Sequence, residues 1–461
     1  MSGTEYAYLA PSAFTQGDFG GRLDLATSGG SSAQGMLAHP FFFSGFVEHP
    51  AVVAQGLLLL ARTARTRFYV PPNTLAAVLR AADPVVTSTP EGLRFESFSA
   101  CCGVYARLDV DRAALDASHL EAGVTNVDVN PPLRQALAGL RATEPLHLSV
   151  GSQKLRVSTL AGEVVEERVP LPKRWLAGFA ETQMLAASMS AQLEIPGPQI
   201  RRFVQGLPRS AAAKTVMWAT RTARTVRLAA QPSPGSVCVA GPERLRVIEP
   251  MLRFATALRG YGPAAAPGSL PLPSAWVLEV PGGRVTIALS PGKSRGFSGE
   301  GAVLHSLSGA QVAGDAELLE ALLNFDPRID VARLSAAAGI DGTRVLGALN
   351  LLASSGQVGF DLALGTYFHR PLPVRAESLD EVNPRLRNAR RLVEAGAVAA
   401  NAATSGDEFT VRSAGVPYTV RISQASEEDR CTCPWYAKHR GTRGPCKHVL
   451  AARIASGRTA S

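Results

Sequence analysis

The chain has 461 residues, of which 46% are hydrophobic and 18% charged, so it is long enough for several folded domains and too apolar for extended disorder. Its formal net charge of +9 is modest for this length. No stretch reaches the roughly 18 consecutive apolar residues that span a bilayer, and the segment 1–30 lacks the basic and apolar regions of a signal peptide. We therefore expect a cytoplasmic protein without membrane contact.

The region 1–309 predicts a mixture of strands and helices, and its role is not evident from sequence. Strands are expected at 67–70, 93–108, 147–160, 275–280 and 285–289, and helices at 52–63, 73–82, 133–140, 175–192 and 245–258. The Pro-, Gly- and Ala-rich stretch 261–273 is the clearest loop, and it would divide the region if two domains are present. Cys101 and Cys102 lie in an apolar run typical of a buried strand, so we expect core thiols there.

No standard catalytic motif is complete in this region. The glycine-rich segment 294–301 lacks the Lys-Ser/Thr ending of a P-loop and the glycine order of a dinucleotide loop, and Glu300 occupies the last position of a G-x-S-x-G frame. We expect a turn here and no enzyme activity, although sequence alone does not exclude groups that meet only in the folded chain.

The segment 312–374 predicts three short helices followed by two strands. The helices are expected at 316–325, 331–338 and 341–355, with Asp330 as an N-cap, and the strands lie on either side of Leu364 and Gly365. This order is similar to the winged helix-turn-helix family. Its third helix carries a single cation, Arg344, whereas DNA-reading helices present more polar groups, so we expect a packing or protein-docking module.

Three cysteines and a histidine near the C-terminus give the strongest chemical signal. Cys431, Cys433, Cys446 and His448 form a C-x-C pair, a twelve-residue gap and a C-x-H pair. Three thiolates and an imidazole are the ligand set of a closed, tetrahedral zinc site, which leaves no position for a reactive water. We predict one structural Zn²⁺, with His439 as the less favourable alternative to His448. The six cysteines are too sparse for a disulfide framework, which agrees with a reducing compartment.

Basic and aromatic residues surround this cluster. The segment 430–461 contains seven Lys and Arg residues and no Asp or Glu. Cations of this kind bind phosphates, and aromatic rings stack on unpaired bases. The alternative is that the rings form the core of a small finger and the cations are solvated. The expected nucleic-acid or partner contacts are Trp435, Tyr436, Lys438, Arg440, Arg443 and Lys447.

The C-terminal segment 377–461 resembles the SWIM zinc-finger family at its C-x-C and C-x-H pairs and at the alternating segments 408–413 and 418–422 that precede them. The resemblance implies a ββα zinc finger that binds proteins or nucleic acids. The region 1–309 also looks like the N-terminal region that accompanies this finger in long bacterial proteins, notably at 294–304, and such proteins are associated with AAA-type ATPase and von Willebrand A-type partners.

Three functions therefore remain open: a zinc-dependent interaction protein that docks onto proteins, a DNA- or RNA-binding protein that uses the basic finger, and an enzyme hidden in 1–309. Sequence favours them in that order. The fold expected overall is α+β and multidomain, with a large N-terminal region (1–309), a winged-helix-like segment (312–374) and the finger (377–461).

Overall fold

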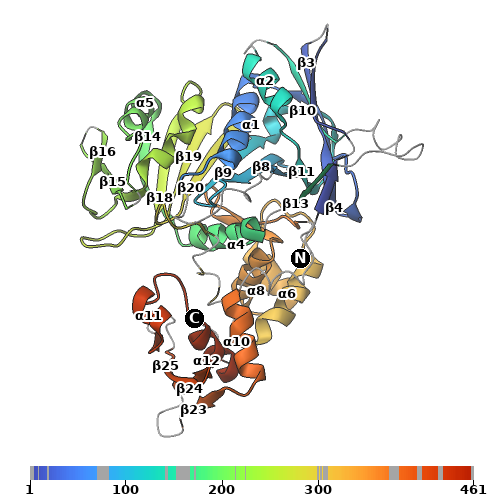
Figure 1. Cartoon of the computed structure of the whole chain (residues 1–461). Helices are drawn as coiled ribbons and strands as arrows, with labels where there is room; N and C mark the ends of the chain where they lie inside the picture. The colour runs from blue at the N-terminus through green and yellow to red at the C-terminus, as the bar shows by residue number, and fades with distance from the viewer. Residues whose placement is uncertain are drawn as a thin grey trace.

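The computed structural model shows an α+β protein with several sheets and a small helix-and-strand unit at its C-terminal end (Figure 1). The structure describes residues 5–8, 10–17, 20–69, 83–140, 144–151, 167–170, 173–212, 214–223, 225–297, 301, 304, 310–372, 384–401, 407–423 and 429–457. Within these residues, no helix combines the length and apolarity needed to cross a bilayer. The α+β class expected from sequence is confirmed.

The largest element is an antiparallel sheet of ten strands. In spatial order these are β14 (Ser190–Pro196), β18 (Ala257–Gly262), β19 (Ser274–Val280), β20 (Gly283–Leu289), β9 (Val104–Asp111), β8 (Gly92–Phe98), β7 (Val85–Thr89), β11 (Gly123–Val127), β4 (Thr27–Ser32) and β5 (Gly35–Leu37). At its middle β9 pairs with β20, so segments distant in sequence form one continuous sheet. The loop 263–273 connects the neighbouring strands β18 and β19, and a domain boundary there stays a prediction.

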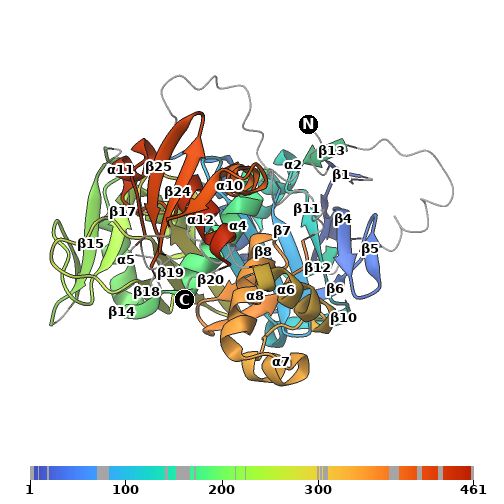
Figure 2. The same ribbon diagram turned by 90° about the horizontal axis from the view of Figure 1, so that it is seen from below.

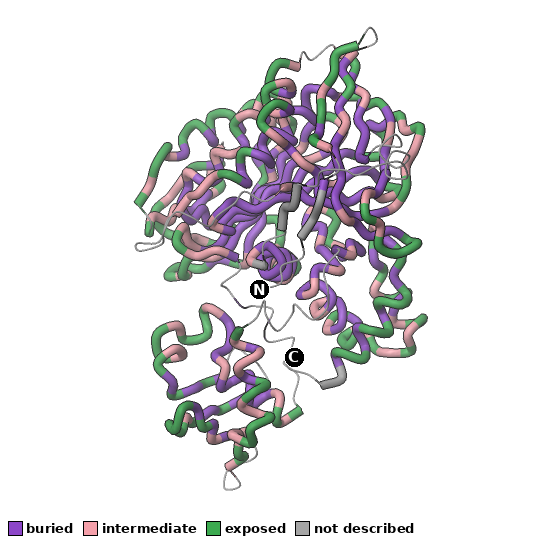
Figure 3. Tube along the Cα trace, turned by 45° about the vertical axis from the view of Figure 1, so that its right-hand side comes forward, coloured by how far each residue is buried: buried purple, intermediate pink, exposed green. Residues whose placement is uncertain are grey.

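The two faces of this sheet carry different side chains because successive residues of a strand point to opposite sides. Val104, Ala106 and Leu108 of β9 face a hydrophobic core that includes helix α1 (Pro50–Arg65). The intervening residues point to the other face, part of which packs on helix α4 (Lys173–Ala187) through an aromatic cluster around Phe98. These central strands are among the most deeply buried parts of the chain (Figure 3).

Smaller sheets and helices complete the N-terminal region. A five-stranded sheet has the order β10 (Leu115–Leu120), β6 (Phe43–Val47), β12 (Leu146–Val150), β3 (Gly20–Leu25) and β2 (Ala13–Gly17), and a three-stranded sheet has the order β16 (Val226–Ala229), β15 (Val216–Arg221) and β17 (Val237–Ala240). Strands β1 (Glu5–Tyr8) and β13 (Glu167–Pro170) form a pair. The remaining helices are α2 (Pro131–Gly139), α5 (Gly197–Gln205) and the 3₁₀ segments η2 (Arg112–Ala114) and η3 (Pro242–Met251).

Three helices and a hairpin follow, and we call residues 310–369 the helix–hairpin unit. Its elements are α6 (Ala310–Leu322), α7 (Val331–Ala338), α8 (Gly342–Ser354), β21 (Val358–Asp361) and β22 (Thr366–His369). Asp330 caps α7 and Asp341 caps α8, each accepting two backbone N–H bonds, while Gly339 ends α7 in a left-handed conformation. The predicted order of elements is confirmed. The unit lies against α4 and, through Asp361, against strands β8, β9 and β20; Figure 2 shows its helices beside α4.

The C-terminal unit, residues 384–457, contains a four-stranded sheet and three helices. Its elements are α10 (Pro384–Glu394), β23 (Val398–Ala400), β24 (Glu408–Ser413), β25 (Val416–Arg421), β26 (Arg430–Cys431), α11 (Pro434–His439) and α12 (Lys447–Ser456). Two predictions from sequence correspond closely to β24 and β25, which turn at Gly415 in a left-handed conformation. Helix α11, inside the twelve-residue gap between the ligand pairs, is an addition to the expected ββα pattern.

Several predicted elements of the N-terminal region are confirmed, and others are wrong. Strands β19 and β20 and helices α1 and α2 lie where expected. The single strand expected at 93–108 is two strands, because the chain turns at 99–103 and Cys102 adopts a left-handed conformation. Cys102 is still buried, whereas Cys101 is only partly buried. No strand forms over 67–69.

Two helix predictions fail at their ends for identifiable reasons. The helix expected at 175–192 stops at Ala187. The chain then forms β14, in which buried and exposed residues alternate, and β14 pairs with β18 in the large sheet. The helix expected at 245–258 is the 3₁₀ segment η3 with Pro250 inside it, and its last residues begin β18. The helix expected at 73–82, and 152–160 of the strand expected at 147–160, lie outside the described residues.

Candidate metal centre

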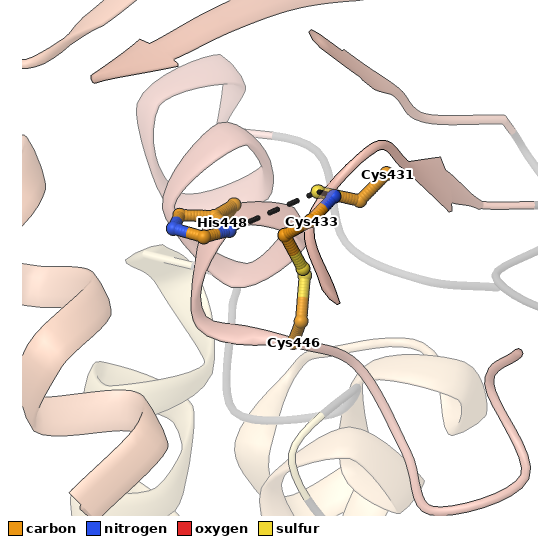
Figure 4. Close-up of side chains that lie close together, drawn as sticks. All are labelled: Cys431, Cys433, Cys446 and His448. Atoms are coloured by element: carbon orange, nitrogen blue, oxygen red, sulfur yellow. Dashed lines mark hydrogen bonds between the residues drawn. The ribbon is translucent and has the colours of Figure 1, made fainter. Parts of the chain in front are cut away.

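The four residues predicted as zinc ligands converge on one point (Figure 4). Each of Cys431, Cys433, Cys446 and His448 offers one ligand atom, and these atoms all lie within 4.8 Å of one another. All four side chains are buried. The sulfur of Cys431 lies 3.8 Å from Nδ1 of His448, so this ring nitrogen faces the thiols.

Local backbone structure explains this convergence. Cys431 ends strand β26, and Cys433 is the N-cap of α11, where its sulfur accepts the backbone N–H of Tyr436. Cys446 is the N-cap of α12, and its sulfur accepts the N–H of Val449. The N–H groups and the positive end of a helix stabilise negative charge. Two of the three thiols are therefore placed where a thiolate is favoured.

Two of the thiols have raised pKa values in the protein alone. Hydrogen bonding to Cys446, together with burial, raises the pKa of Cys433 to about 12. Hydrogen bonding to Cys431 and burial raise the pKa of Cys446 to about 11. These two thiols thus resist ionisation as long as only their protein neighbours surround them. A divalent cation provides the positive charge that allows coordinating thiols to lose their protons.

The imidazole of His448 is oriented by packing. Its ring stacks on Tyr418 with centroids 4.4 Å apart and an interplanar angle of 23°. Its Nε2 is buried without a hydrogen-bond partner among the described residues, so the stacking contact takes the place of the acceptor that usually orients a metal-binding histidine. His439, the alternative ligand, instead packs on Trp435 with ring centroids 4.7 Å apart and is not part of the cluster.

A buried ion pair that sequence analysis did not identify braces the centre. Arg453 of α12 binds both carboxylate oxygens of Asp429, at 2.7 and 2.8 Å, and Asp429 lies immediately before β26. The Tyr436 hydroxyl donates to the Asp429 carbonyl at 2.6 Å. The pair connects the end of the last helix to the strand that carries Cys431. Its signal in the sequence was weak, because the two partners are 24 residues apart.

The predicted contact residues have two kinds of environment. Trp435 is half-buried beneath the guanidinium of Arg385, which lies 5.0 Å from its ring centroid, and Tyr436 is also half-buried. Both rings therefore take part in the packing of the unit itself. Lys438 and Arg440 are exposed, whereas Arg443 and Lys447 are partly buried. Whether any of them contacts a partner stays a prediction.

The return loop before Cys446 contacts the rest of the chain. Arg385 of α10 donates to the carbonyls of Arg443 and Pro445 at 2.6 and 3.1 Å, and Arg295 donates to the carbonyl of Thr442 at 3.0 Å. Ala180 of α4 belongs to the same core as the cysteines. The metal centre is thus joined to the N-terminal region by specific contacts.

The donor set fits a single zinc ion with a structural role. Soft thiolates and an imidazole are the preferred ligands of zinc, and four protein ligands complete its tetrahedral shell. With no open position, the ion would hold the chain and would not activate water. These features define a small zinc-stabilised module, the class to which zinc fingers belong.

Comparison with known families specifies the module. Residues 418–456 match the SWIM zinc finger model, so this part of the chain is a SWIM zinc finger. No curated protein matches the chain. Among solved structures, the chain is similar to the Proliferating Cellular Nuclear Antigen from Entamoeba histolytica, with 10% identity over 54% of this chain and 99% of that one and a TM-score of 0.33. A likeness at this level does not define the fold.

Proposed function

We propose that the protein is a zinc-dependent interaction protein that uses its SWIM finger to dock onto a partner protein. The observation that carries the proposal is the closed, fully buried ligand set, which assigns the metal to structure and leaves the surface of the finger for binding. No catalytic role is proposed for the chain. The reducing environment that keeps the zinc-binding thiols available makes the cytoplasm the proposed location.

The helix–hairpin unit is proposed to be a winged-helix module that packs or docks and does not read DNA. Helix α8, in the place of a recognition helix, packs against α4 and α6. Its only cation, Arg344, is held by Asp315 through bonds of 2.9 and 2.5 Å. A DNA-reading helix needs free donors toward the major groove, and this helix offers few.

The resemblance to long bacterial SWIM proteins makes an AAA-type ATPase or a von Willebrand A-type protein the proposed class of partner. The test begins with proximity labelling in the native cell, using wild type, Cys446→Ser and His439→Asn. A candidate partner is then purified and titrated with zinc-loaded full-length protein. We expect Cys446→Ser to weaken the complex at least about tenfold through loss of the folded finger and His439→Asn to leave it unchanged. A complex equally tight with Cys446→Ser would refute docking through the finger.

Nucleic-acid binding is the second candidate because exposed cations cluster on the finger. Arg421, Arg430, Lys438 and Arg440 are all exposed. Asp429, next to Arg430, is already paired with Arg453, whereas Glu408 lies opposite Arg421 in the strand register. The zinc-loaded protein should be titrated with short single- and double-stranded DNA and RNA over a salt series. Zinc-dependent binding that weakens steeply with salt would promote this candidate, and Lys438→Gln with Arg440→Gln should then flatten the salt dependence. No binding at low salt would remove it.

A further inference from the structure

One polar row crosses the face of the ten-stranded sheet that the helix–hairpin unit covers. In the strand register Thr87 of β7 is opposite Arg94, Arg94 is opposite Asp109, and Asp109 is opposite Arg284 of β20. Residues directly opposite each other in an antiparallel pair project from the same face. The row therefore places two guanidinium groups, a carboxylate and a hydroxyl side by side on one face of the sheet.

Asp361, at the end of β21, closes over this row. Its Oδ2 accepts bonds from Arg94 at 2.7 Å, Arg284 at 2.7 Å and Arg107 at 3.1 Å, while Oδ1 accepts the backbone N–H groups of Ala363 and Leu364. Burial alone would raise the pKa of Asp361, but the three arginines hold it well below its ordinary value, so it is ionised.

The charges of this cluster do not balance. The three arginines face two carboxylates, Asp361 and Asp109, which leaves one excess positive charge at the interface. Glu91 and Asp111 also line the cavity, but so do Arg112 and Arg328, so including these four groups leaves the excess at one positive charge. An excess charge in a partly desolvated site favours an anionic ligand.

A cavity of about 460 Å³ opens directly on the polar row. Thr87, Arg94, Asp109 and Arg284 line one side, and Arg328, Leu364 and Phe368 of the helix–hairpin unit line the other. Arg94 lies flat on the Phe368 ring, 3.8 Å from its centroid, so the guanidinium is rigidly placed. The volume is within the range of small-molecule sites.

Several donors at this cavity make no hydrogen bond to the residues that the structure describes. The hydroxyl of Thr87 is buried, with the residue 1% exposed, and makes no hydrogen bond. Nε of Arg284 is buried and lies 3.4 Å from Oδ2 of Asp109 in an ion pair, but it makes no hydrogen bond. Arg94 and Arg284 make their described hydrogen bonds through Nε or Nη2, which leaves Nη1 of each available to a ligand. A buried donor without a hydrogen bond is uncommon in folded proteins, and a bound group in the cavity would satisfy it.

We propose that this cavity binds a small molecule through a phosphate group, held by Arg94, Arg284 and Thr87. Guanidinium forks and a hydroxyl match the several acceptor oxygens of a phosphate. The site is independent of the zinc finger, so it goes beyond the function proposed above. It also places the ligand between the sheet and the helix–hairpin unit, in contact with both.

The central test compares two threonines that differ only in their relation to the cavity. Thr87→Val removes the unpaired hydroxyl at the site, whereas Thr286→Val removes an equally buried, unpaired hydroxyl that does not line it. Inorganic phosphate and a nucleoside monophosphate are each titrated calorimetrically into the full-length, zinc-loaded protein, against chloride at equal ionic strength. We expect saturable binding of at least one probe, weakened about tenfold by Thr87→Val because a hydrogen bond to a charged group is lost, and unchanged by Thr286→Val.

A change in folding stability would not account for a difference in phosphate binding between Thr87→Val and Thr286→Val. Neither hydroxyl has a partner, so replacing each by an isosteric methyl group should leave the melting temperature unchanged or raise it. A second pair of variants changes the wall of the cavity. Leu364→Glu adds a negative charge there and should weaken phosphate binding about tenfold, whereas Leu364→Gln adds a side chain of similar size without the charge and should hardly change it. Binding no stronger than that of chloride for both probes, or equal affinity within each pair of variants, overturns the proposal.

Discussion

The replacement Cys446→Ser isolates the contribution of the metal from that of local helix structure. Cys446 has two roles: its sulfur is one of the four clustered ligand atoms, and it caps α12 by accepting the N–H of Val449. Serine is a good N-cap, so the capping bond can be kept. Serine is a poor zinc ligand because zinc prefers the soft thiolate. The variant therefore removes a ligand while it spares the helix start.

The expected effect is large. A structural zinc site contributes about 10–16 kcal/mol of apparent binding free energy, most of which becomes folding free energy. Loss of an outer-shell partner alone lowers metal affinity 10- to 100-fold in typical sites, so loss of a direct ligand should lower it by more than about 100-fold. The finger core beneath the site contains Val449, Leu450, Ala451 and Ala452, and α12 is too short to stay folded alone.

Hydrogen–deuterium exchange measures this outcome by segment. Cys446→Ser, or chelation of wild type, should remove amide protection from β26, α11 and α12 while β8, β9, β19 and β20 keep theirs. His439→Asn is the matched control, since His439 lies within the same loop but outside the cluster. Protection that persists across 429–457 in the chelated protein would show that packing, and not zinc, holds the finger.

Three further outcomes are expected. Burial lowers the pKa of His369 to about 4, so stability should be complete above about pH 6.5 and fall by up to about 3 kcal/mol as the pH drops toward 4; urea unfolding of His369→Gln should lack this decrease. Gly444 has φ of +70°, and a Cβ there would collide with the Gly301 carbonyl, whereas Gly441 has φ of +79° and open space around it. Gly444→Ala should therefore lower the melting temperature of the finger clearly more than Gly441→Ala. Asp361→Asn should destabilise the protein by about 3–5 kcal/mol by leaving buried arginines uncompensated, whereas the cap replacement Asp341→Asn should change unfolding by only a few tenths of a kcal/mol; equal effects of the two would contradict the role of the arginine cluster.

The finger was largely predictable because its determinants are local. The four ligands lie within 18 residues, the chemistry of thiols limits what such a cluster does, and the strands before it alternate cleanly. The same holds for the helix–hairpin unit, where Asp330, Asp341 and Gly339 mark helix ends by capping rules that act over a few residues.

The N-terminal sheet was less predictable because its determinants are distant contacts. Residues 188–192 continue the helix predicted from sequence, yet from Ser190 onward the chain forms β14, because pairing with β18, more than 60 residues away, satisfies its backbone. The turn at Cys102 escaped notice because its left-handed residue is neither glycine nor asparagine. Helix α11 was missed because it is only six residues long and begins at a ligand.

The polar row had a sequence signal that acquires meaning only in three dimensions. Three segments, LRFESF, ARLDVD and GRVTI, each alternate charged and apolar residues as solvent-facing strands do. Here the polar face is covered by a second part of the fold, and Asp361, more than 70 residues beyond the last of these strands, completes it. Alternation shows which residues share a face, but it does not show whether water or protein covers that face.

The helix–hairpin unit meets the ten-stranded sheet through buried charges, and these charges also position the wall of the cavity. Burying these charges costs desolvation that apolar side chains would avoid, so the cluster is not explained by stability alone. Asp361 can meet Arg94, Arg107 and Arg284 together in only one position of the hairpin, whereas an apolar contact would tolerate sliding. The cluster therefore fixes the register in which Leu364 and Phe368 face Thr87 across the cavity. It follows that Asp361→Asn should loosen the hairpin and speed amide exchange in β21 and β22, while Thr87→Val should leave exchange there unchanged; equal exchange in the two variants would show that Asp361 does not fix this register.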